Sequence, residues 1–162
     1  RVVDAEDENL VYGYGRSIWA LIDTDSRQPQ NIMDIRDGEI LNYIETDKAC
    51  PIGALSRVRM SKDAGLVDSV PTHYSDVDVN GHINSVKYIE HVLDLFALDT
   101  YREYRIKRFD IAYVAESYYG DTLNYYREDV SDDVFCVRIT RVPPESSEET
   151  EVCRCKIEFV KD

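Results

Sequence analysis

The chain has 162 residues, 43% of them hydrophobic, which suits one domain with a real core. A formal net charge of −13 at pH 7 disfavours nucleic-acid binding, which needs clustered Lys and Arg. No apolar run approaches the roughly 18 residues of a membrane span. The four cysteines, at positions 50, 136, 153 and 155, lack zinc-binding spacing, and 153 and 155 would share one strand face. We therefore expect free thiols and a cytoplasmic protein.

The first third of the chain contains short segments of β composition. Residues 1–22 predict a hairpin, with Trp19 in a core, and residues 23–36 predict a turn and a short exit strand. An isolated hairpin is only marginally stable in water, so these strands need a partner. Residues 37–68 form a connection, with a short helix over 38–43 and a brief strand over 54–60.

The rest of the chain predicts one long helix among long strands. A strand over 70–74 leads through a polar loop into a helix over 83–97. The apolar positions of that helix, at Val86, Ile89, Val92, Leu93 and Phe96, fall on one stripe of a 3.6-residue period. Strands follow over 104–117, 121–129, 133–142 and 150–160. This order favours an α+β fold in which an antiparallel sheet wraps around a central helix.

The polar loop, which carries Asp76, Asp78, Asn80 and His82, has two simple interpretations. Asn80-Gly81 is a strong turn signal, so the loop could be no more than a turn. Its acidic spacing also resembles an EF-hand, but the twelfth position is Lys87 where a bidentate carboxylate is needed, so we reject calcium. The loop also precedes a helix N-terminus, where unpaired backbone N–H groups could stabilise an oxyanion.

The segment YSDVDVNGHINSVKYIE resembles the active-site segment of the acyl-acyl carrier protein (acyl-ACP) thioesterases, which have tandem hot-dog domains. In that family an Asp-x-Asn-x-His loop is followed, 34 residues after the His, by a Glu in the next long strand. Here Glu116 stands 34 residues after His82, and a Tyr-Gly-Asp follows it closely, as in the family. Plant members usually have Cys directly after this Glu, where this chain has Ser117.

The resemblance implies a hot-dog fold and a domain organisation. Residues 1–36 would be the closing strands of a partial first hot-dog domain, 37–68 a linker, and 69–162 a complete second domain with the catalytic motif. Hot-dog sheets commonly pair edge to edge, which allows a homodimer. The implied reaction is hydrolysis of fatty acyl-ACP to free fatty acid and ACP, which ends chain elongation, without a metal or cofactor.

The expected site consists of Asp78, Asn80, His82 and Glu116. Asn80 and His82 would bind the thioester carbonyl or orient water, Asp78 would fix the imidazole tautomer, and Glu116 would be the partner of His82. Strand alternation would point Ser117 away from Glu116, so we interpret Ser117 as structural. His73, His91 and Asp76 are also interpreted as structural residues.

Residues 101–108 form a basic run in an otherwise acidic chain. Arg102, Arg105, Lys107 and Arg108 stand against a single Glu103, a net charge of +3. Such a run could steer the acidic ACP, or it could protect a solvated strand edge. Two functional alternatives stay open: an acyl-CoA thioesterase with the same site, and a non-catalytic acyl-binding hot-dog module.

Overall fold

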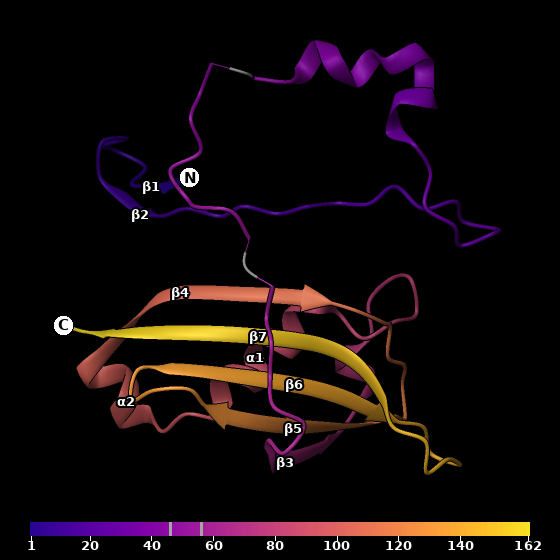
Figure 1. Ribbon diagram of the computed structural model, residues 1–162, viewed down its shortest axis with the longest axis vertical. Coiled ribbons are helices and arrows are strands. Elements are labelled where there is room, and N and C mark those ends of the chain that lie inside the picture. The colour runs from indigo at the N-terminus through magenta and orange to yellow at the C-terminus, as the bar shows by residue number, and fades with distance from the viewer. Residues whose placement is uncertain (46, 56) are drawn as a thin grey trace. The chain divides into compact units, whose positions relative to one another are not determined.

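A computed structural model describes residues 1–45, 47–55 and 57–162 (Figure 1). The chain divides into two compact units, residues 1–55 and residues 56–162, which we describe separately. The predicted domain limits, 36/37 and 68/69, stay predictions. Among the described residues, no helix has both the length and the apolar character to cross a membrane.

The unit of residues 1–55 has little regular structure. Strands β1 (Val2–Val3) and β2 (Val11–Gly13) pair as an antiparallel hairpin, as predicted but much shorter. The element η1 (Ile32–Tyr43) follows as two 3-10 segments joined by a kink at residues 35–38. Gly38 is the one buried residue among those described here. The prediction of a buried Trp19 is wrong, since the side chain is 88% exposed, because no layer of this unit covers it.

The connection to the second unit is irregular. Residues 54, 55 and 57–60 form no strand, which corrects the predicted strand over 54–60; position 56 lies outside the described residues. Strand β3 (Gly65–Pro71) begins earlier than the predicted 70–74 and gives way to a short 3-10 helix, η2 (Tyr74–Asp76).

The unit of residues 56–162 is built on a five-stranded antiparallel sheet. Its strands β3, β4 (Tyr104–Tyr113), β5 (Thr122–Asp129), β6 (Val134–Val142) and β7 (Thr150–Lys161) lie in the order β3-β5-β6-β7-β4. Adjacent hairpins supply β5-β6-β7, while β3 and β4 close the two edges. The last three strands match their predicted ranges within two residues, and β4 ends four residues early.

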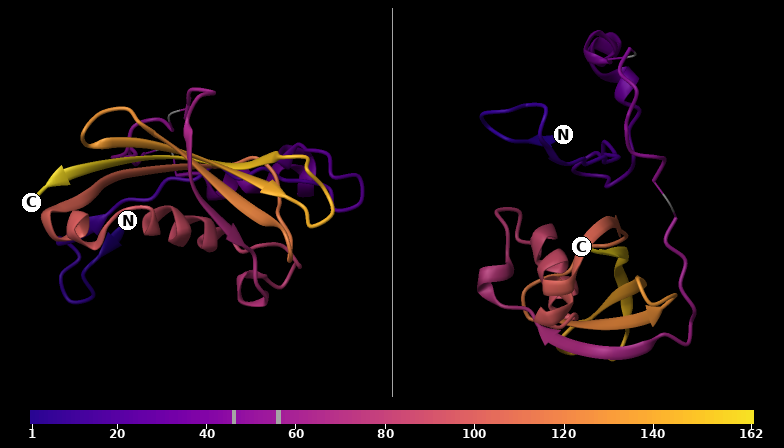
Figure 2. Two further views of the ribbon diagram at one scale, coloured as in Figure 1. Left: turned by 90° about the horizontal axis from the view of Figure 1, so that it is seen from below. Right: turned by 90° about the vertical axis from the view of Figure 1, so that its left-hand side faces the viewer.

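Helix α1 (Ser85–Asp94) packs against one face of this sheet, with the short α2 (Leu98–Glu103) after it (Figure 2). A sheet wrapped around one central helix is the hot-dog fold that the sequence predicts. The predicted apolar stripe is partly wrong, because Val86 is 50% exposed. Tyr88 and Val92 are the buried residues of α1, and Phe96 continues their face one turn further on.

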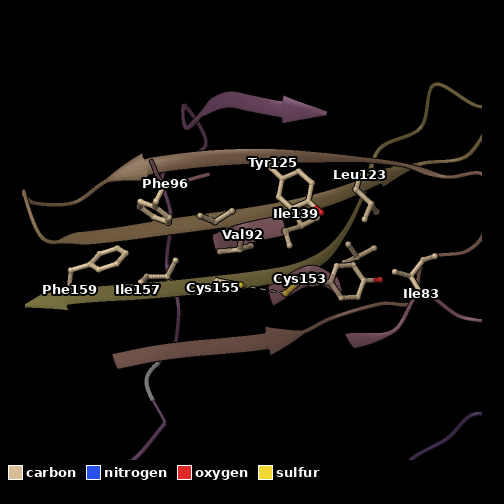
Figure 3. Packing of buried hydrophobic residues seen from close by; sticks show 13 residues of the cluster. Ile83, Val92, Phe96, Leu123, Tyr125, Ile139, Cys153, Cys155, Ile157 and Phe159 are labelled. Carbon is tan, nitrogen blue, oxygen red and sulfur yellow. Dashed lines mark hydrogen bonds between the residues drawn. The ribbon is translucent and has the colours of Figure 1, made fainter. Parts of the chain in front are cut away.

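The core lies between α1 and the inner face of the sheet (Figure 3). Its buried members are Ile83, Tyr88, Val92, Phe96, Leu123, Tyr125, Val137, Ile139, Val152, Cys153, Cys155, Ile157 and Phe159. Alternation along β7 places Cys153, Cys155, Ile157 and Phe159 on the same face, as predicted for the two cysteines. Each large apolar side chain buried in this way contributes roughly 1.5–3 kcal/mol, and the core holds the loop at the start of α1 in place.

Candidate active site

The loop between β3 and α1 is a tight turn closed by backbone hydrogen bonds. Val77 and Ile83 form an antiparallel bridge across its base. Inside it, the Asp78 N–H donates to the carbonyl of His82 (2.8 Å), and the Gly81 N–H donates to the carbonyl of Asp78 (3.1 Å). Gly81 has a φ of +82°, a conformation that other residues rarely adopt, so the Asn-Gly pair does form the predicted turn.

The carboxylate of Asp78 holds the inside of this turn. It accepts the backbone N–H groups of Asn80 (2.8 Å) and His82 (3.2 Å) and faces the Asn80 amide nitrogen at 3.4 Å. Partial burial favours the neutral acid, but these hydrogen bonds outweigh it and lower the pKa of Asp78 below its usual value. Asp78 was expected to orient the imidazole of His82; its hydrogen bonds instead hold the backbone beneath that imidazole.

Glu116 lies in the loop after β4 rather than inside a strand, which corrects the predicted strand over 104–117. The carbonyl of the next residue, Ser117, accepts the Ile83 N–H at 2.9 Å. This bond fastens the Glu116 loop to the end of the turn that carries His82. Side chains 34 residues apart in the sequence are thereby brought to one place.

His82 and Glu116 meet at this place. Nε2 of His82 lies 3.4 Å from Oε2 of Glu116, and the two side chains are 27% and 39% exposed. The pair is therefore shielded on several sides and still open to solvent and substrate. An imidazole beside a carboxylate is an arrangement that can take up a proton from water and release it again.

The start of α1 is less available for oxyanion binding than predicted. The side chain of Asn84 caps the helix by accepting the Val86 N–H, and the Asn84 N–H donates to the carbonyl of Asp76. The Ile83 N–H is used by Ser117. These three N–H groups already have acceptors. The side-chain amide of Asn80 has two N–H bonds, and its contact with Asp78 uses one of them.

Ser117 points into the core. Its side chain is fully buried and shares a hydrogen bond with the hydroxyl of Tyr88 on α1. Burial raises the pKa of Tyr88, so its hydroxyl stays protonated at neutral pH. Ser117 thus turns away from Glu116, as predicted, although the segment is a loop and strand alternation is not the reason.

The residues interpreted as structural sit in structural roles. Asp76 is buried, and its carboxylate accepts the His73 N–H at 2.7 Å. The ring of His91 packs edge-on against Tyr125. Sequence reasoning missed Tyr118, which contacts both His82 and Glu116. The signal that could have found it is its place two residues after Glu116.

The basic run at 101–108 is neutralised in the structure. Arg102 pairs with Asp99, Arg105 with Asp162, Lys107 with Glu158, and Arg108 with Asp110, at 2.6–3.2 Å. Three of these cations lie on β4, an edge strand. Each positive charge has a carboxylate beside it, so the local field is weaker than the sequence alone suggests.

The comparisons with known proteins agree with this architecture. The family model for the acyl-ACP thioesterase C-terminal domain matches residues 60–162, so the chain belongs to the acyl-ACP thioesterase family. The search of curated proteins found no match.

Many solved structures are similar to this chain, among them the following two. An acyl-ACP thioesterase from Bacteroides thetaiotaomicron is 41% identical, with a TM-score of 0.74 over 86% of this chain and 53% of that one. The 12:0-ACP thioesterase from Umbellularia californica is 19% identical, with a TM-score of 0.67 over 87% of this chain and 53% of that one. The second likeness supports the fold alone. The chain thus spans about half the length of both proteins.

Proposed function

We propose that this chain carries the catalytic residues of a thioesterase that hydrolyses fatty acyl-ACP to free fatty acid and ACP, which ends chain elongation. The observation that carries the proposal is the 3.4 Å contact between His82 Nε2 and Glu116 Oε2. Membership of the family and the 41% identity to the Bacteroides acyl-ACP thioesterase support the same reaction.

In the proposed mechanism Glu116 is the general base. It takes a proton from water while the water oxygen bonds to the thioester carbonyl carbon. His82, beside the carboxylate, orients Glu116 and the water, and the amide of Asn80 donates to the carbonyl oxygen. The carbon–sulfur bond then breaks, and the proton on Glu116 passes to the thiolate of the carrier. Asp78 keeps the loop in the conformation that presents Asn80 and His82.

The identity of the carrier rests on the family more than on charge. Because each cation of 101–108 has an acidic partner, the predicted ACP contact by Arg102, Arg105, Lys107 and Arg108 loses part of its support. The same site could serve an acyl-CoA, which stays the second candidate. A non-catalytic acyl-binding module is disfavoured, because such a module has no need of an imidazole–carboxylate contact.

The setting of the reaction is also proposed. The free thiols of all four cysteines, three of them buried, suit a reducing compartment such as the cytoplasm. A homodimer could form through β3 or β4, the two edges of the sheet.

The test is hydrolysis of acyl-ACP and of acyl-CoA, measured on this chain and on a longer version of it. Glu116→Gln should lower the rate by about a hundredfold or more, the usual scale for the loss of an acid–base group, and His82→Ala should do the same because it removes the group that orients this base. His73→Ala is the matched control, since its ring pairs with Asp76, outside the His82–Glu116 pair, and it should keep its activity. Near-normal hydrolysis by either folded site variant would overturn the mechanism.

A further inference from the structure

Tyr118 touches both members of the His82–Glu116 pair. Its ring meets the imidazole of His82 edge-on, with ring centroids 5.3 Å apart and an angle of 82° between the planes. Its hydroxyl donates to Oε2 of Glu116 at 3.3 Å, the same oxygen that faces His82. A single side chain therefore contacts the imidazole and the carboxylate where they meet.

The backbone of Tyr118 is fixed by buried polar groups. Its N–H donates to Oδ2 of Asp121 at 2.9 Å, and its carbonyl accepts the hydroxyl of Thr72 at 2.9 Å. Asp121 and Thr72 are both buried, and Thr72 directly follows β3. The position of Tyr118 is thus set by the sheet, although Tyr118 itself belongs to a loop.

The ring of Tyr118 is also held by Arg141 on β6. The guanidinium carbon lies 5.3 Å from the ring centroid, and Nη1 of Arg141 is 3.2 Å from Oδ2 of Asp121. Asp121 therefore binds both the backbone of Tyr118 and the cation that faces its ring. Such an arrangement resists rotation of the ring.

We propose that Tyr118 is a positioning residue that holds His82 and Glu116 in their productive geometry; this rests on the proposed function of that pair. Glu116 lies in a loop with a partly exposed side chain, which without restraint would sample several rotamers. The Tyr118 hydroxyl selects the rotamer that faces His82, and the ring edge limits rotation of the imidazole.

The side chain of Glu116 contacts His82 and Tyr118. Asp121 binds the backbone of Tyr118, and Arg141 lies over its ring. Asp78 accepts the backbone N–H of His82. Removing the Tyr118 hydroxyl leaves these charged groups in place, so a change in kcat reports on the contact between Tyr118 and Glu116.

The first experiment is the steady-state kinetics of Tyr118→Phe, with kcat and KM measured separately. We expect kcat to fall about threefold to tenfold with KM unchanged, because one supporting hydrogen bond is lost. The control is Tyr119→Phe at the exposed neighbouring tyrosine, which should match wild type. A wild-type kcat for Tyr118→Phe, or the same loss in both variants, would overturn the proposal.

The second experiment needs no activity. Nuclear magnetic resonance of the imidazole groups can follow His82, with His73 and His91 as the two other histidines of the chain. Tyr118→Leu removes both ring and hydroxyl, so the His82 ring signals should move while those of His73 stay. An effect on His82 in a chain that hydrolyses no thioester would support the positioning role and refute the proposed function. Hydrolysis that depends on His82 and Glu116, with His82 signals insensitive to Tyr118, would refute the positioning role alone.

Discussion

The backbone N–H of Ile83 donates to the carbonyl of Ser117 at 2.9 Å, and this one bond joins the two segments of the candidate site. The side chain of Ser117 also forms a hydrogen bond with the hydroxyl of Tyr88 on α1. We call these two hydrogen bonds of Ser117 the clamp. Its two neighbours in the sequence, Glu116 and Tyr118, point toward His82. A buried serine thus anchors the loop that presents the candidate base.

The first prediction concerns the stability of this clamp. Ser117→Ala leaves the buried hydroxyl of Tyr88 without its partner, so the free energy of unfolding should fall by about 1–3 kcal/mol. Tyr88→Phe should be destabilising for the same reason. The double variant should lose less than the sum of the two single losses, because neither polar group is left unpaired. Urea unfolding of the four proteins checks this, and additive losses would show that the two side chains are not coupled.

The second prediction concerns the chemistry of Ser117. Its hydroxyl is buried against Tyr88 and turned away from Glu116, so it is poorly placed to attack a thioester. Ser117→Ala should therefore keep activity within about tenfold of wild type, the effect of losing one supporting hydrogen bond. Mass spectrometry during turnover should detect no acylated Ser117. A trapped acyl-serine, with loss of activity in the alanine variant, would make Ser117 the nucleophile.

The apolar periodicity predicted helix α1, but it assigned part of the buried face of the helix to the wrong residues. The 3.6-residue stripe included Val86, which is exposed, and left out Tyr88, which is buried. A tyrosine is polar at one end, so its burial depends on a hydrogen-bond partner, here Ser117, from a distant segment. No pattern within the helix itself contains that information.

The third prediction tests this corrected face with two matched valines. Val92→Ala removes two methyl groups from a fully buried position, so the free energy of unfolding should fall by about 1–3 kcal/mol. Val86→Ala makes the same chemical change at an exposed position and should stay within about 0.5 kcal/mol of wild type. Thermal or urea unfolding measures both. Equal losses in the free energy of unfolding would support the apolar stripe that the sequence predicts for α1.

The part of the candidate site in which a fixed spacing links two motifs was predictable from the sequence. The contacts that depend on the course of a loop were not. The 34-residue interval between His82 and Glu116 indicated their contact, since it matches a known family pattern. The predicted role of Asp78 on the imidazole stays a prediction, while its hydrogen bonds to the backbone of Asn80 and His82 are contacts that the sequence did not predict. Tyr118 stands two residues after Glu116, which indicates the same side of the chain, but its contacts with both His82 and Glu116 depend on the course of the loop after β4.

The fourth prediction follows from the lowered pKa of Asp78. A carboxyl whose pKa is lower in the folded protein stabilises the fold above its unfolded value of 3.8, and this stabilisation is lost as the pH falls through the lower folded value. The amide protons of Asn80 and His82 should therefore titrate together, with a midpoint below pH 3.8. In Asp78→Asn this step should vanish. A midpoint at or above 3.8 would show that the hydrogen bonds do not control the ionisation of Asp78.

The last prediction concerns capture of the carrier. Arg105 and Lys107 are exposed on β4 and paired with Asp162 and Glu158. If they attract the acidic ACP, reversing both to Glu should slow acyl-ACP hydrolysis at low substrate concentration and leave a short acyl-CoA nearly unaffected. The difference should shrink as salt rises, because a Debye length of about 8 Å at 0.15 M ionic strength screens exposed charges.

Variants of the acidic partners of Arg105 and Lys107 test the direction of the effect of charge on acyl-ACP capture. Glu158→Gln and Asp162→Asn keep the cations and remove their acidic partners, so they strengthen the positive field of β4. Acyl-ACP capture should then become faster at low salt, opposite to the effect of the charge reversals. Stopped-flow or initial-rate kinetics across a salt series measures both pairs of variants. Equal changes on the two carriers, or no dependence on salt, would mean that the charges of β4 only protect the edge of the sheet.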